Sequence, residues 1–311
     1  MLGKILKDVI QGRAKAGATG PLSSELPPPE LIESANSSLD SGDVASAEIA
    51  LAQAMSRYPE QPATQQLFAR MEFVQCLAAA EAKLPGPNYL DWLKWFQQRL
   101  KPASYVEIGV ESGQSLQYAQ APTRAIGIDP ALRIVHSQTA WIKLFQLPSD
   151  EFFQRHDLRQ ILGADAVDLA FIDGLHTFDQ ALKDFMNVER YADAGTIVLF
   201  HDIFPVTAKT AERERVTTFW VGDTWKVMMI LKKYRPDLTL FTIPTHPSGL
   251  GVVTGLKPNE QLLWRDFESI CAEAMAQTLD DFPPQIDDHL NLVPNDFNAV
   301  ASLLDRRHHS A

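Results

Sequence analysis

The stretch Tyr105-Val106-Glu107-Ile108-Gly109-Val110-Glu111-Ser112-Gly113 decides the fold of this 311-residue chain. Its apolar run ends at Gly109, and Gly113 follows four residues later, which is typical of a buried strand that turns tightly into a helix. One β/α unit further on, a second apolar run ends at Gly127-Ile128-Asp129. This repetition predicts a parallel α/β sheet.

Seven apolar runs fit strands of such a sheet, and they are nearly continuous, as expected of strands covered on both faces. The predicted strands are Tyr105–Val110, Ala125–Asp129, Lys143–Leu147, Val167–Asp173, Thr196–Phe200, Leu238–Ile243 and Gly251–Val253. The predicted helices between them include Ser112–Ala119, Phe152–Leu162, Phe178–Tyr191 and Thr224–Tyr234. Five β/α units and two closing strands predict an α/β fold, a Rossmann-like, seven-stranded, doubly wound sheet over residues 88–256.

The chain before this domain has a different pattern. Residues 1–29 are predicted to be a leader or linker, and residues 30–87 a helical extension that ends at Pro85-Gly86-Pro87. Alanines and leucines recur there at helical spacing, in a unit similar to a single tetratricopeptide (TPR-like) repeat. One repeat cannot bury a continuous core, so we expect a helical hairpin packed on the main domain or on a dimer mate. Such helices offer a surface for a homodimer. Residues 257–311 are predicted to be a C-terminal helical segment and tail, with a break at Pro283-Pro284.

Composition narrows the class of protein. The chain is 45% hydrophobic and 22% charged, as in ordinary globular domains, and its net charge of −11 argues against nucleic acid as a partner. Cys76 and Cys271 belong to no CxxC pair, which favours a reducing compartment. No apolar run reaches about 18 residues, and the N-terminus does not resemble a secretion signal. We therefore expect a cytoplasmic protein without a membrane span.

The glycine loop and Asp129 indicate an adenosine cofactor. Ligands of open α/β sheets lie beyond the carboxyl ends of the strands, where Gly109 would let the backbone approach a ligand and Asp129 could accept both ribose hydroxyls. The loop lacks the G-x-G-x-x-G pattern of dinucleotide sites. Its carboxylates, Glu107 and Glu111, would repel a pyrophosphate but suit the sulfonium and amino groups of S-adenosylmethionine (SAM). SAM is therefore favoured over NAD, although a tight turn and a helix cap would also explain these residues.

Other residues extend this predicted cofactor site. Ser112 and Gly113 complete the loop, and Asp173 ends the fourth strand at the same edge of the sheet. Ser149-Asp150 follows the third strand, where it would either bond the adenine ring or cap the helix Phe152–Leu162.

A second polar group follows the fourth and fifth strands. His176 stands three residues after Asp173, and His201 and Asp202 end the fifth strand. Two carboxylates and an imidazole can bind a divalent cation such as Mg²⁺, which would lower the pKa of a bound hydroxyl. A nearby histidine could take the proton. Each of these residues alone would also fit a structural role.

These motifs resemble the class I SAM-dependent methyltransferases, and most closely the bacterial branch with macrocin O-methyltransferase and the cephalosporin hydroxylase-like proteins. The resemblance covers residues 88–256. It rests on YVEIGVESGQSL at 105–116, AIGID at 125–129, DLAFIDGLHTFDQALKDF at 168–185 and IVLFHD at 197–202. It implies O-methylation of a small hydroxylated or glycosylated acceptor.

The resemblance also implies roles for individual residues. Asp173 and Asp202 would be metal ligands and His176 the general base. His201 would be the third ligand, at a position where the relatives have an acidic residue. Imidazole binds Mn²⁺ better than Mg²⁺, so the sequence leaves open which ion is bound, and whether one is bound at all.

The polar segment 212–226, with Trp220 and Trp225, fits a substrate lid or a solvated face.

Two further classes of protein stay open. A non-catalytic SAM-binding scaffold would use residues 30–83 to recruit a partner. A metal-dependent Asp/His hydrolase or oxygenase would leave Glu107 and Asp129 without a purpose.

Overall fold

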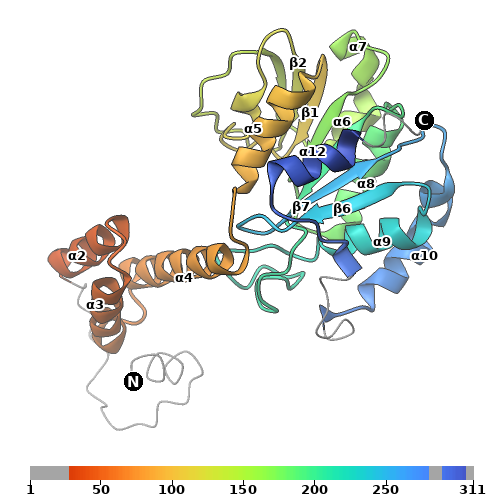
Figure 1. Cartoon of the computed structure of the whole chain (residues 1–311). Helices are drawn as coiled ribbons and strands as arrows, with labels where there is room; N and C mark the ends of the chain where they lie inside the picture. Colours follow the sequence, from red (N-terminus) through yellow and green to blue (C-terminus); the bar gives the residue numbers. More distant parts are fainter. Residues whose placement is uncertain (1–27, 280–288, 306–311) are drawn as a thin grey trace. The chain divides into compact units, whose positions relative to one another are not determined.

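The computed structural model describes residues 28–279 and 289–305 (Figure 1), so the predicted leader over 1–27 and the break at Pro283-Pro284 lie outside it. The chain forms two compact units. The smaller one comprises residues up to Ala78 together with Thr217–Phe219, and the larger one comprises the remaining residues.

The smaller unit is built from helices. They are α2 (Pro29–Asp40), α3 (Val44–Arg57) and the first part of α4 (Pro62–Lys83). Asp43 caps α3 by accepting the Ser46 N–H at 3.1 Å, which satisfies a free donor of the first turn. Ala35 and Ala47 are fully buried in the unit's own core. These alanines therefore pack the helices of one chain together.

The larger unit contains the predicted seven-stranded sheet, with strand order β3-β2-β1-β4-β5-β7-β6. Strands β1 to β5 are parallel, and β7 runs antiparallel to both β5 and β6. The predicted fold is thus confirmed. The strands are β1 (Ser104–Ile108), β2 (Arg124–Ile128), β3 (Trp141–Phe145), β4 (Leu169–Ile172), β5 (Ile197–His201), β6 (Thr239–Ile243) and β7 (Leu250–Thr254).

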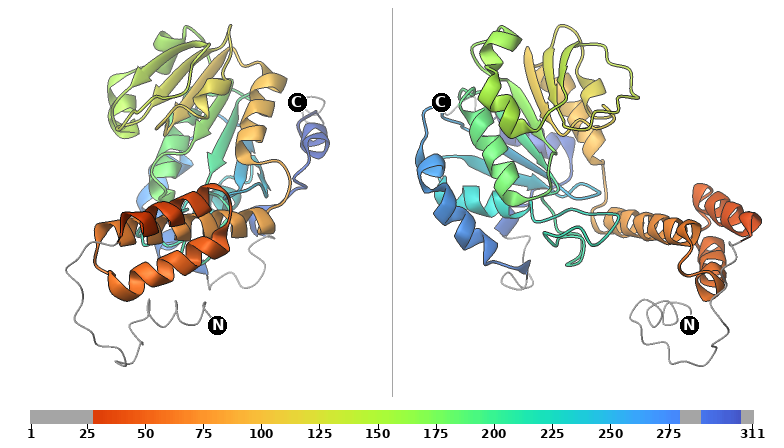
Figure 2. Two further views of the ribbon diagram at one scale, coloured as in Figure 1. Left: turned by 90° about the vertical axis from the view of Figure 1, so that its left-hand side faces the viewer. Right: turned by 180° about the vertical axis from the view of Figure 1, so that it is seen from behind.

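Helices cover both faces of this sheet (Figures 1 and 2). One face packs on α6 (Ser149–Arg155), α7 (Leu158–Leu162), α8 (Phe178–Glu189), α9 (Lys226–Tyr234) and α10 (Leu262–Met275). The other packs on α5 (Tyr89–Leu100), the 3-10 helix η1 (Leu116–Tyr118) and α12 (Phe297–Asp305). Successive strand residues alternate between the two cores, so Val106 faces α8 whereas Tyr105 faces α5.

The predicted helix Ser112–Ala119 is wrong: only the 3-10 turn Leu116–Tyr118 forms there. Glu111 and Gly113 have φ angles of 45° and 78°, which a right-handed helix excludes. The Glu111 carbonyl also accepts the N–H of Arg133 at 2.8 Å instead of a helical donor. The loop between β2 and β3 thus takes the backbone partner that a helix would need.

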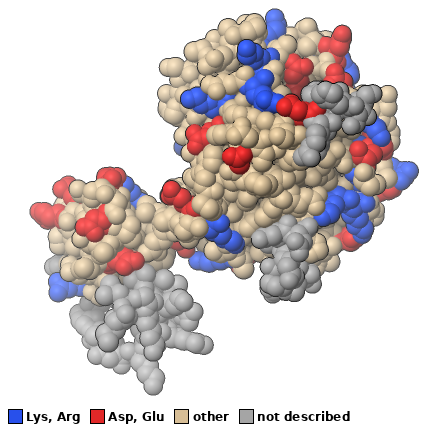
Figure 3. All heavy atoms as spheres, in the orientation of Figure 1, with Lys and Arg blue, Asp and Glu red and all other residues tan. Residues whose placement is uncertain are grey.

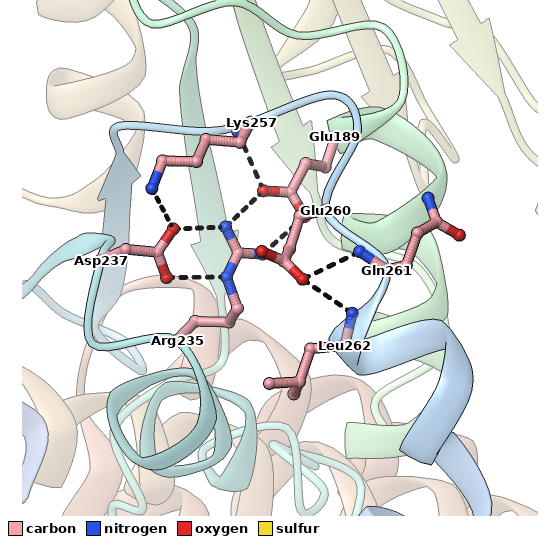
Figure 4. Close-up of polar contacts among 7 residues, drawn as sticks. All are labelled: Glu189, Arg235, Asp237, Lys257, Glu260, Gln261 and Leu262. Carbon is pink, nitrogen blue, oxygen red and sulfur yellow. Dashed lines mark hydrogen bonds and ion pairs between the residues drawn. The ribbon is translucent and has the colours of Figure 1, made fainter.

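A buried ion-pair network ties several elements together (Figure 4). Arg235, only 1% exposed, bonds the Glu189 carboxylate at 2.8 and 2.9 Å and the Asp237 carboxylate at 2.9 and 3.0 Å. The Lys257 N–H also donates to Glu189 at 3.2 Å. This network joins the end of α8 to the segments after α9 and β7, and it satisfies the buried guanidinium on two sides.

Acidic and basic side chains are interspersed over the larger unit on the face shown in Figure 3. None of the helices within residues 28–279 and 289–305 is long and apolar enough to cross a membrane.

Candidate active site

Four neighbouring strands bring the predicted site residues to one edge of the sheet. The strand order β2-β1-β4-β5 places the carboxyl ends of these strands side by side. Asp129, Gly109, Asp173 and His201 stand at these four ends in the same order.

The glycine loop packs against the end of β4. Gly109 has a φ of 88°, and a Cβ there would lie 1.9 Å from the Asp173 carbonyl oxygen. The neighbour that requires glycine here is therefore the Asp173 backbone, whereas the sequence analysis placed a ligand against it. The close approach fixes Asp173 beside the loop.

Asp129 holds the same loop from β2. One carboxylate oxygen accepts the N–H groups of Val110 and Glu111, both at 2.9 Å, and the other accepts the Ala131 N–H at 2.6 Å. The side chain is thus oriented by the backbone that the predicted cofactor would contact. Its role toward a ribose stays a prediction.

Glu107 lies under the loop and is fully buried. Tyr105 and Ser115 donate their hydroxyls to its two oxygens, each at 2.6 Å. Burial raises the pKa of this carboxyl to about 8, although both hydrogen bonds oppose the shift. Burial thus favours the neutral acid, whereas the two hydroxyl donors favour the carboxylate, and the role of Glu107 toward the cofactor stays a prediction. Glu111 is exposed at the loop surface.

Ser149 and Asp150 lie within the first turn of α6, whose N-cap is Pro148 without a side-chain cap bond. The predicted helix Phe152–Leu162 is instead two helices, α6 and α7, and the predicted cap is wrong. Both side chains accept from Gln180 Nε2, at 3.2 and 3.1 Å.

The same amide donates to Asp184 at 3.1 Å. Burial raises the pKa of Asp184 to about 7, against the hydrogen bonds from Ser149 and Gln180. Gln180 thus connects the segment after β3 to a buried acid of α8. The adenine role of Ser149 and Asp150 stays a prediction.

The predicted catalytic group comes together. His201 Nδ1 lies 3.1 Å from Asp173 Oδ1 and 3.5 Å from Asp202 Oδ2. His176 Nε2 lies 3.1 Å from Asp202 Oδ2 and 3.7 Å from Asp173 Oδ1. His201 and Asp202 are buried, whereas Asp173 and His176 are 21% and 27% exposed.

Asp173, His201 and Asp202 fit a divalent cation. Each offers one ligand atom, and these atoms lie within 4.8 Å of one another. Within the described residues, buried Asp202 Oδ2 has no hydrogen-bond partner, only the two ring nitrogens at ion-pair distance. A buried carboxylate oxygen that accepts no hydrogen bond suits a cation.

The two carboxylates of this cluster control the protonation of His201. Burial lowers the pKa of this imidazole, but the charges of Asp173 and Asp202 outweigh it and hold the pKa well above its usual range. A cation entering the cluster would take the place of the Nδ1 proton. Asp202 has a φ of 57°, a strained angle for a residue with a side chain.

Two residues near this cluster were missed by the sequence analysis. The Tyr89 ring packs against the His201 ring at an interplanar angle of 34°, with centroids 4.2 Å apart, and Ser248 Oγ lies 3.3 Å from His201 Nε2. The capping pair Asn88 and Asp91 marks the start of α5 at Tyr89, but a sequence does not show where that helix points. Ser248 lies in the turn before β7 and carries no such signal.

The segment 212–226 forms part of the surroundings of His176. The Trp220 ring stacks on the His176 ring, with centroids 5.2 Å apart. Trp225 is 1% exposed and therefore packs in the interior. Arg213 pairs with Asp179 and Asp223. Trp220 thus belongs to the site, whereas Trp225 belongs to the interior.

A comparison with known protein families shows what this part of the chain is similar to. A family model described as a methyltransferase domain matches residues 106–203, which run from β1 to just after β5. This stretch of the chain is therefore similar to a methyltransferase domain. A search of curated proteins finds no match to the chain.

Several solved structures are similar to this chain at low sequence identity. The SAM-bound O-methyltransferase from Streptomyces achromogenes involved in tomaymycin synthesis is 13% identical, with a TM-score of 0.42, covering 60% of this chain and 90% of that one. The O-methyltransferase from Bacillus cereus in complex with S-adenosylhomocysteine (SAH) is 15% identical, with a TM-score of 0.39 and the same coverage. The SAH-bound methyltransferase from Podospora anserina is 15% identical, with a TM-score of 0.41, covering 76% of this chain and all of that one.

Proposed function

We propose that this chain is a SAM-dependent O-methyltransferase that acts on a hydroxyl of a small hydroxylated or glycosylated acceptor. The observation that carries the proposal is the meeting of Asp173, His176, His201 and Asp202 at the sheet edge that also holds the glycine loop. Ligands of open α/β sheets bind at this edge, and a methyltransferase domain needs both a cofactor loop and an acceptor site there.

SAM would bind over the loop 107–113. Asp129 is oriented by three backbone bonds and would accept the ribose hydroxyls, and Glu111 is exposed where a cationic group could approach it. Ser149 and Asp150 would contact the adenine. The same edge holds Asp173, so cofactor and acceptor would share one crevice.

The base in this proposal is His176. Its Nδ1 lies 2.8 Å from the Trp220 carbonyl oxygen, which can only accept, so Nδ1 would carry a proton. Its Nε2, which lies 3.1 Å from Asp202 Oδ2, would be the basic atom of the neutral ring. The acceptor oxygen would attack the methyl carbon while the carbon–sulfur bond breaks. The products are the methyl ether and SAH, and the hydroxyl proton goes to His176 Nε2.

Asp173, His201 and Asp202 would hold Mn²⁺ or Mg²⁺, with Mn²⁺ favoured by the imidazole. A bound divalent ion supplies a Lewis acid that lowers the pKa of the acceptor hydroxyl. The carboxylates of Asp173 and Asp202 would also orient the acceptor hydroxyl toward His176.

The test is SAH release from SAM in the presence of a panel of catechols, phenols and glycosides, with and without Mn²⁺. We expect at least one acceptor to support turnover. His176→Ala should reduce kcat by about 100-fold or more while leaving SAH affinity unchanged. Full activity in that variant would remove His176 as the base, and SAM binding without turnover on any acceptor would favour the scaffold class.

A homodimer through the smaller unit stays a prediction. Its alanines are buried in the unit's own core, so the surface for a partner would have to come from side chains such as Ile49, which is 54% exposed. Sedimentation of the full chain and of its Ile49→Asp variant would test the homodimer, which should form in the wild type and be weakened in the variant. A wild-type chain that sediments as a monomer would contradict the prediction.

A further inference from the structure

Three side chains of helix α8 lie beside the segment that follows β3. Gln180, Lys183 and Asp184 are spaced at i, i+3 and i+4, so they share one face of the helix. That face meets the start of α6, where Ser149 and Asp150 occupy the first two positions. Helix α8 therefore contacts the two residues that are proposed to bind the adenine of SAM.

The amide of Gln180 is at the centre of these contacts. Its Nε2 lies 3.2 Å from Ser149 Oγ, 3.1 Å from Asp150 Oδ1 and 3.1 Å from Asp184 Oδ1. Because the Asp150 carboxylate can only accept, the nitrogen of the amide and not its oxygen must face it. One side chain thus links an acid of α6 to an acid of α8.

Asp184 fixes the inner end of this link. Its side chain is in the interior, with 1% of the residue exposed, and a Cβ on Gly174 would lie 3.8 Å from its Oδ2. The acid therefore lies beside the residue that follows Asp173. A hydrogen-bonded group in the interior has few alternative partners, so Asp184 holds the amide of Gln180 in one place.

Asp150 is the outer end of the link. Its side chain is 42% exposed, and its Oδ2 lies 3.6 Å from Lys183 Nζ, whereas Oδ1 is bonded to Gln180. Helix α8 thus supplies one partner for each oxygen of this carboxylate. Two partners limit its rotation, and the remaining lone pairs can still accept a donor from a ligand.

The place of this carboxylate fits the base of a nucleoside. The Asp129 N–H donates to the Phe145 carbonyl at 3.1 Å, so the end of β3 lies beside the residue proposed for the ribose. Asp150 follows this strand end, in the first turn of α6. Its carboxylate could accept the 6-amino group of adenine but would repel the 6-oxo group of hypoxanthine, because that oxygen is itself an acceptor.

We infer that Gln180 is a positioning residue that holds the Asp150 carboxylate for the 6-amino group of the cofactor and thereby sets the preference of the site for adenine. Lys183 holds the other oxygen of the same carboxylate. Without the amide, Asp150 would be free to rotate toward solvent, and the distinction between an amino and an oxo group would weaken. The inference rests on the proposed function, because it needs SAM to bind over the loop 107–113.

The experiment is calorimetry of the full chain with SAH and with S-inosylhomocysteine, which has a 6-oxo group in place of the 6-amino group. The wild type should bind SAH about tenfold more tightly or better, as expected for one hydrogen bond to a charged acceptor. Gln180→Met keeps the length of the side chain without its amide, and it should lower this ratio of affinities by about threefold or more. A merely structural defect would weaken both ligands and leave the ratio unchanged.

Gln154→Met is the matched control, because Gln154 is exposed on α6, the helix that carries Asp150. It should keep both affinities. If Gln180→Met does not fold, Gln180→Asn serves instead, because it keeps an amide that is one methylene shorter and would withdraw from Asp150, and it should lower the ratio in the same way.

An unchanged ratio in the folded Gln180 variant, or equal affinities for the two nucleosides in the wild type, would overturn the inference. Binding of neither nucleoside to the wild type would reject the SAM site and the inference with it. A preference for adenine that depends on Gln180, in a chain that turns over no acceptor, would support the inference and reject the methyltransferase function alone.

Discussion

At the scale of single residues, buried carboxyls of the larger unit have opposite pKa shifts. Burial raises the pKa of Glu107 to about 8 and that of Asp184 to about 7, because the hydrogen bonds to these carboxyls do not offset the loss of water. At Asp202 burial acts in the same direction, but the charges of His176 and His201 outweigh it and lower the pKa. Charged partners therefore decide which acids stay ionised.

Glu107→Gln should change how stability depends on pH. Wild-type Glu107 keeps in the folded state a proton that the unfolded chain loses above a pKa of 4.5. Its contribution to stability is therefore fully present below pH 4.5 and is lost as the pH rises to about 8. Glutamine does not titrate, so the variant should gain stability relative to the wild type across this window. Urea unfolding of both proteins at several pH values measures it, and a constant difference would show that the pKa of Glu107 is not raised.

Gly109→Ala should disturb the site more than its backbone angle alone predicts. Gly163 also has a positive φ, 66°, but a Cβ there would meet no described atom within 4 Å. Gly163→Ala should therefore cost about 1 kcal/mol of backbone strain, and Gly109→Ala several kcal/mol, because it displaces the Asp173 backbone. Denaturant unfolding gives both values. If both variants lost the same free energy of unfolding, the Asp173 backbone would be able to move away from residue 109 without destabilising the protein.

Sequence reasoning located the site residues better than it explained them. Strand ends are visible in a sequence, so Asp173, His201 and Asp202 could be placed together. The contact that demands glycine at Gly109 comes from Asp173, which lies 64 residues further along the chain. The Tyr89 ring reaches His201 from a helix whose direction no local pattern records.

At the scale of elements, apolar runs predicted all seven strands within a few residues, because a strand buried on both faces has little freedom in composition. The helix after β1 was wrong for a reason outside its own residues. The loop between β2 and β3 supplies N–H donors to the carbonyls at Glu111 and Ser112. Such competition between backbone partners is tertiary, and local propensity does not include it.

The Arg235 network (Figure 4) should contribute strongly to the stability of the larger unit. Arg235→Ala would leave Glu189, whose side chain is 5% exposed, without its paired charge, and we expect a loss of about 3–5 kcal/mol. The exposed pair of Arg265 and Asp266 gives the control, and Arg265→Ala should change stability by less than about 1 kcal/mol. Thermal and urea unfolding compare the two. Equal losses of stability in Arg235→Ala and Arg265→Ala would contradict a stabilising role for the buried Arg235 network.

At the scale of the whole molecule, the larger unit contains the complete candidate site at one edge of its sheet. The sequence predicted this sheet because β/α alternation determines topology. It did not predict that Thr217–Phe219, from the segment after β5, belong to the smaller unit. Such a grouping depends on contacts between distant segments, and no periodicity in the chain indicates it.

Calorimetry with SAH tests the central claim most directly, because it needs no acceptor. The wild-type chain should bind SAH at one site per chain. Asp129→Ala should weaken binding at least tenfold, since it removes the carboxylate proposed for the ribose and its bonds to the loop. Asp157→Ala, which alters only the cap of α7, should bind as the wild type does. A wild-type chain that binds neither SAH nor SAM, with or without Mn²⁺, would contradict the account.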